Sequence, residues 1–509
     1  MTLFRNKKRE YMAFLKVLVK VLGAFGLGTI LLSCGTSPGY NYTVSGTVSA
    51  MAGTGLVLQN NGGDDLSISA NGAFSFKTTL TDGSAYNVTV KPGSQPTSPD
   101  QVCTVSNESG TINSGPVSNI VVDCSMNSTT VTIDPTNSFV YMSNYKAASV
   151  SAYAIDKTIT FGALNTITGS PFTAGTYPNT VTIDSTGAFA YVSNVMSGTV
   201  SVYTIGSGGA LIPSTVTPTV SVGKYPNPVT VATVNSKQYA YVSDMGSNDI
   251  YVYAIDPTTG ALAVVTGSPF AAQTSPANVT VLLGKFAYVP NVTSGTISVY
   301  TIDQSTGALI AGTAVSAQTY PMSLTVVTIN SSTQFAYAAN MGSGTISVYS
   351  IDQTTGALTA VETESAGTYP MSLTFDSSNQ YAYVSNVGSA TISVYTIDQT
   401  TGALTASTTT PTVTTGSFPN PVTIATVNSK QYAYVSNKGS DNIYVYTIGT
   451  DGSLSYLQTM AIGNDPNPVK VATVDSKQYA YVSSAGDGGI YAYTIGTDGL
   501  LTAFTGNPF

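Results

Sequence analysis

The residues able to do acid–base or nucleophilic chemistry are few in this chain. It contains no histidine, its only arginines are Arg5 and Arg9, and glutamate after the first forty residues occurs only at Glu108, Glu362 and Glu364. A Ser–His–Asp arrangement is therefore impossible, and no pair of carboxylates recurs at a spacing suited to acid–base catalysis. We predict no catalytic residue, although aspartate is abundant and a mechanism that uses aspartate alone, or with a metal, stays open.

Metal and cofactor sites are not predicted either. The acidic turns at 243–249 and 437–442 lack the ligand spacing of a known calcium loop. Charge also excludes nucleic acid as a partner: after position 34 there are 11 lysines, no arginine and 24 acidic residues, a net charge of −13. Phosphate backbones need clustered cations.

Cys34 follows an export signal. The uncharged stretch Val21–Leu32 has lysines on its N-terminal side and is too short for a comfortable membrane span. Leu31-Leu32-Ser33-Cys34-Gly35 resembles the bacterial lipobox, which implies a diacylglycerol thioether on Cys34. We therefore expect a signal peptide at 1–33, a tether at 34–41 and a lipid anchor in the bacterial cell envelope. In similar lipoproteins an aspartate at the position of Gly35 causes retention in the inner membrane, so the resemblance implies the outer membrane, with the chain periplasmic or surface-exposed. A plain secretory signal is the alternative.

Cys103 and Cys124 are the remaining cysteines. They fall in a segment of short alternating strands at 42–48, 56–59, 66–69, 74–77, 86–91, 102–105 and 120–124. Seven short strands in residues 42–127 predict an Ig-like β-sandwich. In an oxidising compartment we expect these two cysteines to form a disulfide. A catalytic thiol is the alternative, but the chain has no histidine to activate it.

The rest of the chain is periodic. A motif of the form FAYVSN recurs about every 48 residues, and each copy is followed by TISVYTID and a Thr-Gly turn. Four strands in a unit of this size are typical of a propeller blade. We predict an all-β protein with a β-propeller at 128–509; eight blades are favoured, and seven blades with a displaced unit are the alternative. The motif tyrosines are Tyr141, Tyr191, Tyr241, Tyr288, Tyr337, Tyr383, Tyr434 and Tyr481.

This unit, with Tyr191-Val192-Ser193-Asn194 and its copies, resembles the YVTN-type repeat of the lactonase-like β-propellers. The resemblance implies a hydrolase of the 6-phosphogluconolactonase type. Activity in that family is associated with His, Arg and carboxylate residues, and a phosphorylated sugar acid needs cationic partners. The composition after position 34 argues against that activity.

Aromatic and amide side chains remain as binding candidates. The chain enters most repeats through an X-Pro segment that carries these side chains. This segment lies on the same face of the propeller as the turns that follow Asn194 and its equivalents. A ring of such groups suits a neutral polar ligand such as a glycan; the alternative is that the tyrosines pack between blades and the amides cap turns. The candidate face comprises Tyr177, Asn179, Tyr225, Asn227, Tyr320, Tyr369, Phe418, Asn420 and Asn467.

These observations favour an exported, lipid-anchored propeller that acts as a non-catalytic binding or scaffold module for a protein or glycan partner. The alternative is a lactonase-like hydrolase.

Overall fold

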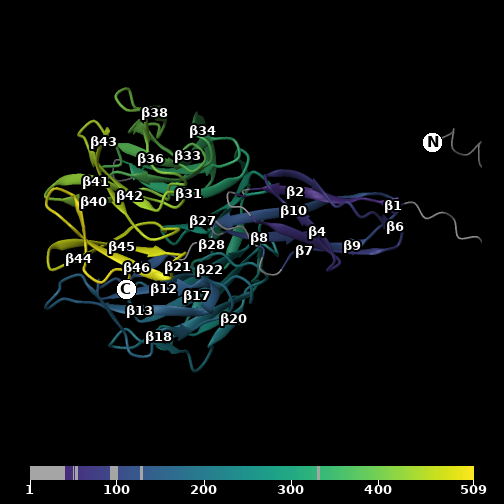
Figure 1. The fold of residues 1–509 in the computed structure, drawn as a ribbon, viewed down its shortest axis with the longest axis horizontal. Helices are drawn as coiled ribbons and strands as arrows, with labels where there is room; N and C mark the ends of the chain where they lie inside the picture. The colour runs from purple at the N-terminus through teal and green to yellow at the C-terminus, as the bar shows by residue number, and fades with distance from the viewer. Residues whose placement is uncertain are drawn as a thin grey trace, which may run out of the picture.

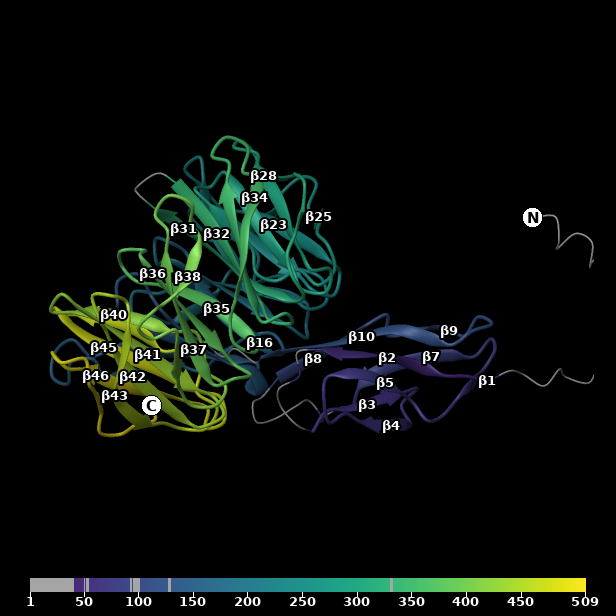
Figure 2. The same cartoon turned by 90° about the horizontal axis from the view of Figure 1, so that it is seen from above.

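The computed structural model describes residues 41–49, 51, 55–91, 94, 101–126, 130–329 and 333–509. The predicted signal peptide and Cys34 lie outside the described residues. Two all-β units follow each other along the chain, and the smaller one lies beside the larger one in both views (Figures 1 and 2). Within the described chain no helix is long and apolar enough to span a membrane.

The smaller unit is a sandwich of two four-stranded sheets with orders β5-β2-β10-β8 and β4-β3-β7-β9. All seven strands expected from the alternating pattern are present; the short β1, β6 and β9 carried too little pattern to be predicted. Its strands are β1 (Asn41–Tyr42), β2 (Val44–Ser49), β3 (Val57–Asn60), β4 (Asp64–Ser67), β5 (Gly72–Ser75), β6 (Leu80–Thr81), β7 (Ala85–Val90), β8 (Gln101–Ser106), β9 (Ser109–Thr111) and β10 (Val117–Met126).

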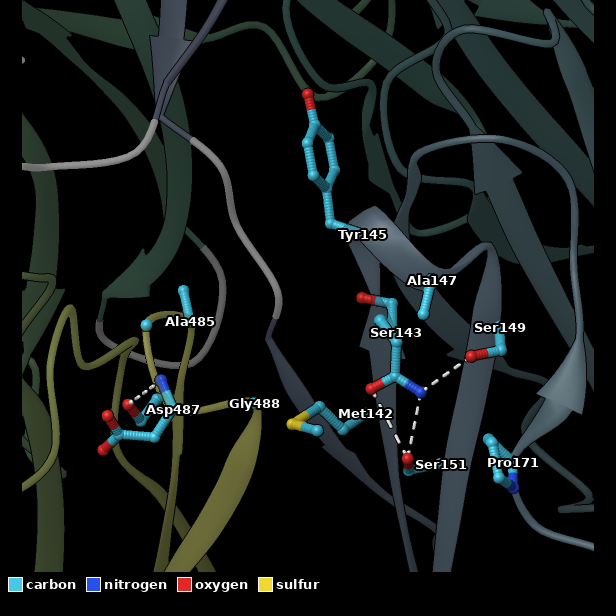
Figure 3. Close-up of a pocket in the computed structure, with 13 residues that line it drawn as sticks. Met142, Ser143, Tyr145, Ala147, Ser149, Ser151, Pro171, Ala485, Asp487 and Gly488 are labelled. Carbon is cyan, nitrogen blue, oxygen red and sulfur yellow. Dashed lines mark hydrogen bonds between the residues drawn. The ribbon is translucent and has the colours of Figure 1, made fainter. Parts of the chain in front are cut away.

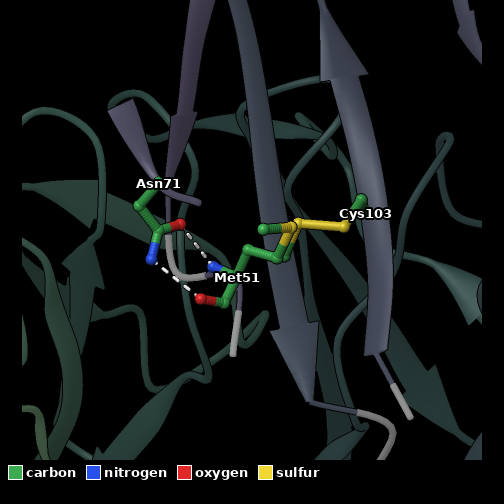
Figure 4. The surroundings of a disulfide bond; sticks show 4 residues. Met51, Asn71 and Cys103 are labelled. Atoms are coloured by element: carbon green, nitrogen blue, oxygen red, sulfur yellow. Dashed lines mark hydrogen bonds between the residues drawn. A yellow bond between two sulfur atoms is a disulfide. The ribbon is translucent and has the colours of Figure 1, made fainter. Parts of the chain in front are cut away.

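The expected disulfide is confirmed. Cys103 and Cys124 lie directly opposite each other on the antiparallel strands β8 and β10, with Cα atoms 3.9 Å apart. Both cysteines are buried in the sandwich core together with Met51. The backbone N–H of Met51 donates to the side-chain oxygen of Asn71 at 2.7 Å, and the Asn71 amide donates to the Met51 carbonyl at 2.8 Å (Figure 4). The bridge therefore joins neighbouring strands of one sheet and packs into the core.

The larger unit contains, in residues 130–329 and 333–509, one sheet for each of the eight sequence repeats. Val, Ile, Tyr and Thr fill these strands because branched and aromatic side chains pack well on a pleated surface. The innermost strands are β11 (Val131–Ile133), β16 (Pro178–Ile183), β21 (Thr230–Val234), β26 (Thr280–Leu282), β31 (Pro321–Ile329), β35 (Pro370–Phe375), β40 (Thr423–Val427) and β44 (Lys470–Val474).

The second strands carry the motif tyrosines and are antiparallel to the first. They are β12 (Phe139–Asn144), β17 (Phe189–Asn194), β22 (Lys237–Asp244), β27 (Phe286–Asn291), β32 (Thr333–Asn340), β36 (Tyr381–Asn386), β41 (Lys430–Asn437) and β45 (Lys477–Ser484). In the first repeat a 3-10 turn, η2 (Tyr145–Ala147), leads into the third strand. The third strands are β13 (Ser149–Ile155), β18 (Thr199–Ile205), β23 (Asp249–Ile255), β28 (Thr296–Ile302), β33 (Thr345–Ile351), β37 (Thr391–Ile397), β42 (Asn442–Ile448) and β46 (Gly489–Ile495).

The outer edge of each sheet is a shorter fourth strand, and five sheets add a short extra strand that pairs with the third. The fourth strands are β14 (Leu164–Thr166), β19 (Leu211–Pro213), β24 (Leu262–Val264), β29 (Leu309–Ala311), β34 (Leu358–Ser365), β38 (Leu404–Ala406), β43 (Leu454–Ala461) and β47 (Leu501–Ala503). The extra strands are β15 (Phe172–Thr173), β20 (Thr219–Ser221), β25 (Phe270–Ala271), β30 (Val315–Ser316) and β39 (Thr412–Thr414).

The sheets join into a closed ring. Each pair of neighbouring sheets shares one apolar cluster, and the cluster that contains Val131 and Tyr481 joins the first repeat to the last. Each motif tyrosine is fully buried and donates its hydroxyl to a glycine carbonyl in the next sheet, for example Tyr191 to Gly260 at 3.0 Å. These bonds explain why tyrosine, rather than phenylalanine, recurs in the motif.

The glycine of each Thr-Gly turn also has a packing role. Gly402 has φ +73°, and a Cβ built on it would lie 2.4 Å from the ring of Phe335 in the neighbouring sheet. Only glycine fits both the backbone conformation and the ring above it.

The sandwich and the ring are connected by an ion pair as well as by the chain. Lys224, in the segment that enters the third repeat, pairs with Glu108 in the loop between β8 and β9. Both side chains are partly exposed, so this pair contributes at most about 1 kcal/mol.

Candidate functional site

The aromatic residues of the predicted face lie where the chain enters the innermost strands, and four of them pack on turns of their own sheets. Tyr320 lies over Gly342 in the turn of its own sheet, where a Cβ would come within 2.4 Å of the ring. Tyr225, Tyr369 and Phe418 lie in the same way over Gly246, Gly388 and Gly439. These four rings therefore pack on the turns of their own sheets.

The remaining aromatic residue of this face, Tyr177, contacts Tyr145 at a ring-centroid distance of 4.3 Å. Tyr369 is the most open of the group, with an exposed fraction of 38%, and the other rings are half-buried. Lys224 lies 5.8 Å from the Tyr225 ring centroid, where a cation–π contact is favourable.

The amides of the predicted face are used by the fold. Asn227 donates to the carbonyl of Pro276 at 2.8 Å, and Asn420 donates to that of Pro466 at 2.6 Å, each in the next sheet. Asn467 is buried, and its main-chain carbonyl accepts a hydrogen bond from the Ser436 hydroxyl. The main-chain carbonyl of Asn179 accepts one from the Ser143 hydroxyl. The side-chain amides of Asn227 and Asn420 thus hold neighbouring sheets together, and ligand binding by this face stays a prediction.

The turn amides also match the structural alternative. Asn194 is fully buried, accepts from the N–H of Gly175 at 3.0 Å and donates to Thr199 and Ser201. Asp244 takes this position in the third repeat, and burial raises the pKa of its carboxyl group.

A cavity of about 380 Å³ lies where the last repeat meets the first. One wall comes from the first repeat, between Met142 and Ser151, and the other from the turn 484–488 of the eighth (Figure 3). On the first wall Asn144 donates to Ser149 and Ser151 at 3.0 and 2.9 Å. Asn144 is only half-buried, whereas the equivalent Asn194 is fully buried. This hydroxyl and amide cluster therefore faces the cavity.

Asp487 is the only carboxylate among the described residues that line this cavity. Its Oδ2 accepts from the Tyr491 hydroxyl at 2.8 Å and from the N–H of Asn464 at 3.2 Å, and its Oδ1 accepts from the Asn464 amide at 2.9 Å. Burial raises the pKa of Tyr491 to about 12, and the bond to Asp487 adds to this shift. Tyr491 is therefore a stable donor that fixes the orientation of the carboxylate.

The innermost strands carry a second polar feature, which the sequence analysis missed. In every repeat one residue of this strand lies opposite the motif tyrosine; it is threonine in seven repeats and Lys470 in the eighth. Lys470 is also the only ionisable residue on these eight strands. Aligning the eight repeats with each other, and not only locating their tyrosines, would have revealed this exception.

No group of three or more potential metal-binding side chains occurs among the described residues.

The repeated four-stranded sheets, closed into a ring, define a β-propeller. The family model for lactonase, 7-bladed beta-propeller, matches residues 101–420. The chain belongs to this family. The family description names seven blades, whereas the described residues of this chain form eight repeat sheets.

Three solved structures are similar to this chain. Sqt1 from Saccharomyces cerevisiae has a TM-score of 0.55 at 13% identity, over 72% of this chain and 96% of its own. A provisionally assigned 6-phosphogluconolactonase from Bacteroides fragilis has a TM-score of 0.47 at 23% identity, over 57% of this chain and 85% of its own. The periplasmic gluconolactonase of Pseudomonas aeruginosa has a TM-score of 0.45 at 17% identity, over 65% and 93%. No curated protein matches the chain.

Proposed function

We propose that the propeller binds an uncharged lactone of sugar size in the cavity between the first and eighth repeats and hydrolyses it with Asp487 as general base. Membership of the lactonase family supports the reaction class, and it supports this hydrolase alternative more directly than the scaffold interpretation that composition favoured. The observation that carries the assignment of the site is Asp487, the one carboxylate among the described residues that line the cavity, whose side chain is held by Tyr491 and Asn464.

Hydrolysis of a lactone needs one general base and one water molecule. Asp487 accepts a proton from a water molecule, whose oxygen attacks the lactone carbonyl carbon. The ring C–O bond then breaks, and the leaving alkoxide takes the proton from Asp487, which restores the carboxylate. Each carboxylate oxygen has two lone-pair positions, so Asp487 can accept from water while it keeps its present bonds. Ser149 and Ser151 are placed to bind ring hydroxyls of the lactone.

The residues around the cavity favour an uncharged substrate. None of the described lining residues is cationic, and the chain has no arginine after Arg9. A phosphorylated substrate would need a cationic partner that this wall does not offer.

The second candidate is a non-catalytic binding or scaffold module, lipid-anchored through Cys34 in the outer membrane, with a protein or glycan partner. The partial exposure of the aromatic residues of the predicted face favours this candidate, because rings that are open to solvent can stack on a partner. Its binding surface would be the predicted aromatic face, whose partly exposed side chains are Tyr177, Tyr225, Tyr320, Tyr369 and Phe418.

Hydrolysis of glucono-δ-lactone by the purified mature chain separates these candidates. We expect turnover above the spontaneous rate, its loss in Asp487→Asn, and its retention in Asp451→Asn, which changes an exposed aspartate in the turn before β43. Absence of turnover in the wild type, or equal turnover in Asp487→Asn, would refute the hydrolase proposal.

A further inference from the structure

The threonines opposite the motif tyrosines form a regular hydrogen-bond series around the inner wall of the ring. Thr132 donates to the carbonyl of Val181, and Thr182 donates to that of Val229. In each case the acceptor is the residue just before the next threonine. Thr230, Thr280, Thr374 and Thr423 continue the series, with distances of 2.7 to 3.0 Å.

Lys470 occupies the next position of this series. The carbonyl of Val469, the residue just before Lys470, accepts a hydrogen bond from Thr423. The backbone of the eighth repeat therefore follows the same pattern as the others. The Lys470 side chain, however, makes no hydrogen bond or ion pair with any described residue. It is exposed to solvent and lies on β44, which contacts β11 of the first repeat.

The surroundings of Lys470 disfavour an isolated cation. No other residue of the innermost strands is ionisable, so no carboxylate on this wall compensates the ammonium. The surrounding protein excludes enough water to lower the pKa of the ammonium group, even though solvent reaches the side chain. A charge that is partly removed from water and has no partner costs free energy unless an anion binds to it.

We propose that Lys470 is the anchor of a binding site for a small carboxylate on the inner wall of the ring, at the junction of the eighth and first repeats. A sugar acid fits this position because its carboxylate would pair with the ammonium while its hydroxyls meet the threonine hydroxyls on either side. The site deepens the proposed function, since lactone opening yields a hydroxy acid, but the binding inference does not require that the chain catalyses this reaction.

Calorimetric titration of the mature chain with gluconate at low ionic strength tests the site. Lys470→Thr is the natural variant because it restores the residue that the other seven repeats carry, and its fold is expected to survive. Lys430→Thr removes the same charge from an exposed position at the start of β41 and serves as the matched control. We expect gluconate to bind the wild type and Lys430→Thr within twofold of each other, and to bind Lys470→Thr at least tenfold more weakly.

Further arms identify the ligand chemistry. Binding of gluconate but not of glucose supports pairing with the carboxylate, and equal binding of inorganic phosphate would show a general anion site and overturn the carboxylate assignment. Asp487→Asn should keep its gluconate affinity even where it loses lactone turnover, so the two proposals can fail separately. Equal affinity in wild type and Lys470→Thr, or no gluconate binding by the wild type, would refute this inference.

Discussion

The hydroxyl of Tyr481 donates to the carbonyl of Gly162 at 2.8 Å and thereby joins residues that are 319 positions apart. This is the same bond that Tyr141 makes with Gly209 and that Tyr241 makes with Gly307, between repeats that are neighbours in the chain. The last repeat thus meets the first with the geometry of an internal junction. The candidate cavity and Lys470 both lie at this junction.

Removing the closing bond should destabilise the ring. Tyr481→Phe keeps the ring packing but leaves the buried Gly162 carbonyl without its donor, which costs about 1–3 kcal/mol. Urea unfolding followed by tyrosine fluorescence measures this loss, and Tyr241→Phe provides the internal comparison. An unchanged unfolding midpoint in Tyr481→Phe would contradict the closed ring described here.

The disulfide should stabilise only the sandwich. Replacing Cys103 and Cys124 together by alanine opens a loop with a sequence separation of 21, for which loop entropy predicts a loss of about 3 kcal/mol. Two unfolding transitions, recorded with and without reductant, would report the two units separately. The transition of the ring should not move, because no cysteine of the chain falls within it; a shift of both transitions would show that the units are coupled.

Much of this architecture could be predicted because its signals are local and repeated. Period-two alternation marks the strands, and the spacing of the motif tyrosines marks the repeats. The roles of the amides could not be read in the same way, because Asn227 and Asn420 bond to carbonyls more than forty residues away. The sequence did not single out Asp487, because the cavity that it lines forms only where the eighth repeat lies beside the first.

Lys470 should make the protein less stable at neutral pH than a threonine would. Its folded-state pKa is lowered, while the unfolded chain keeps a value of about 10.4. The unfolded chain then holds the proton more tightly, so stability rises as pH increases from the folded-state pKa toward about 10.4. Thermal unfolding at pH 7 should therefore give a higher Tm for Lys470→Thr than for the wild type.

The same comparison at higher pH provides the check. The difference in Tm between the two proteins should shrink as pH rises, because the lysine of the wild type becomes neutral in the folded state. A Tm for Lys470→Thr that is lower than that of the wild type at every pH would mean that the lysine stabilises the ring by contacts, and that its role is structural.

Lipidation of Cys34 remains a prediction from the sequence around it. Labelling of cells with a fatty-acid analogue should mark the wild type and not Cys34→Ala, because the thiol is the acceptor. Cys34→Ala should also appear in the soluble fraction, whereas the wild type should sediment with membranes. Equal labelling of both proteins would show that Cys34 is not the lipid acceptor.

We propose that the junction of the eighth and first repeats is the functional site. A crystal structure of the mature Asp487→Asn chain soaked with glucono-δ-lactone tests it most directly, since this variant should bind the lactone without consuming it. We predict electron density for the ligand between the wall of Ser149 and Ser151 and the turn 484–488. Density over Tyr320 or Tyr369, with the junction empty, would contradict the claim and would favour the aromatic face.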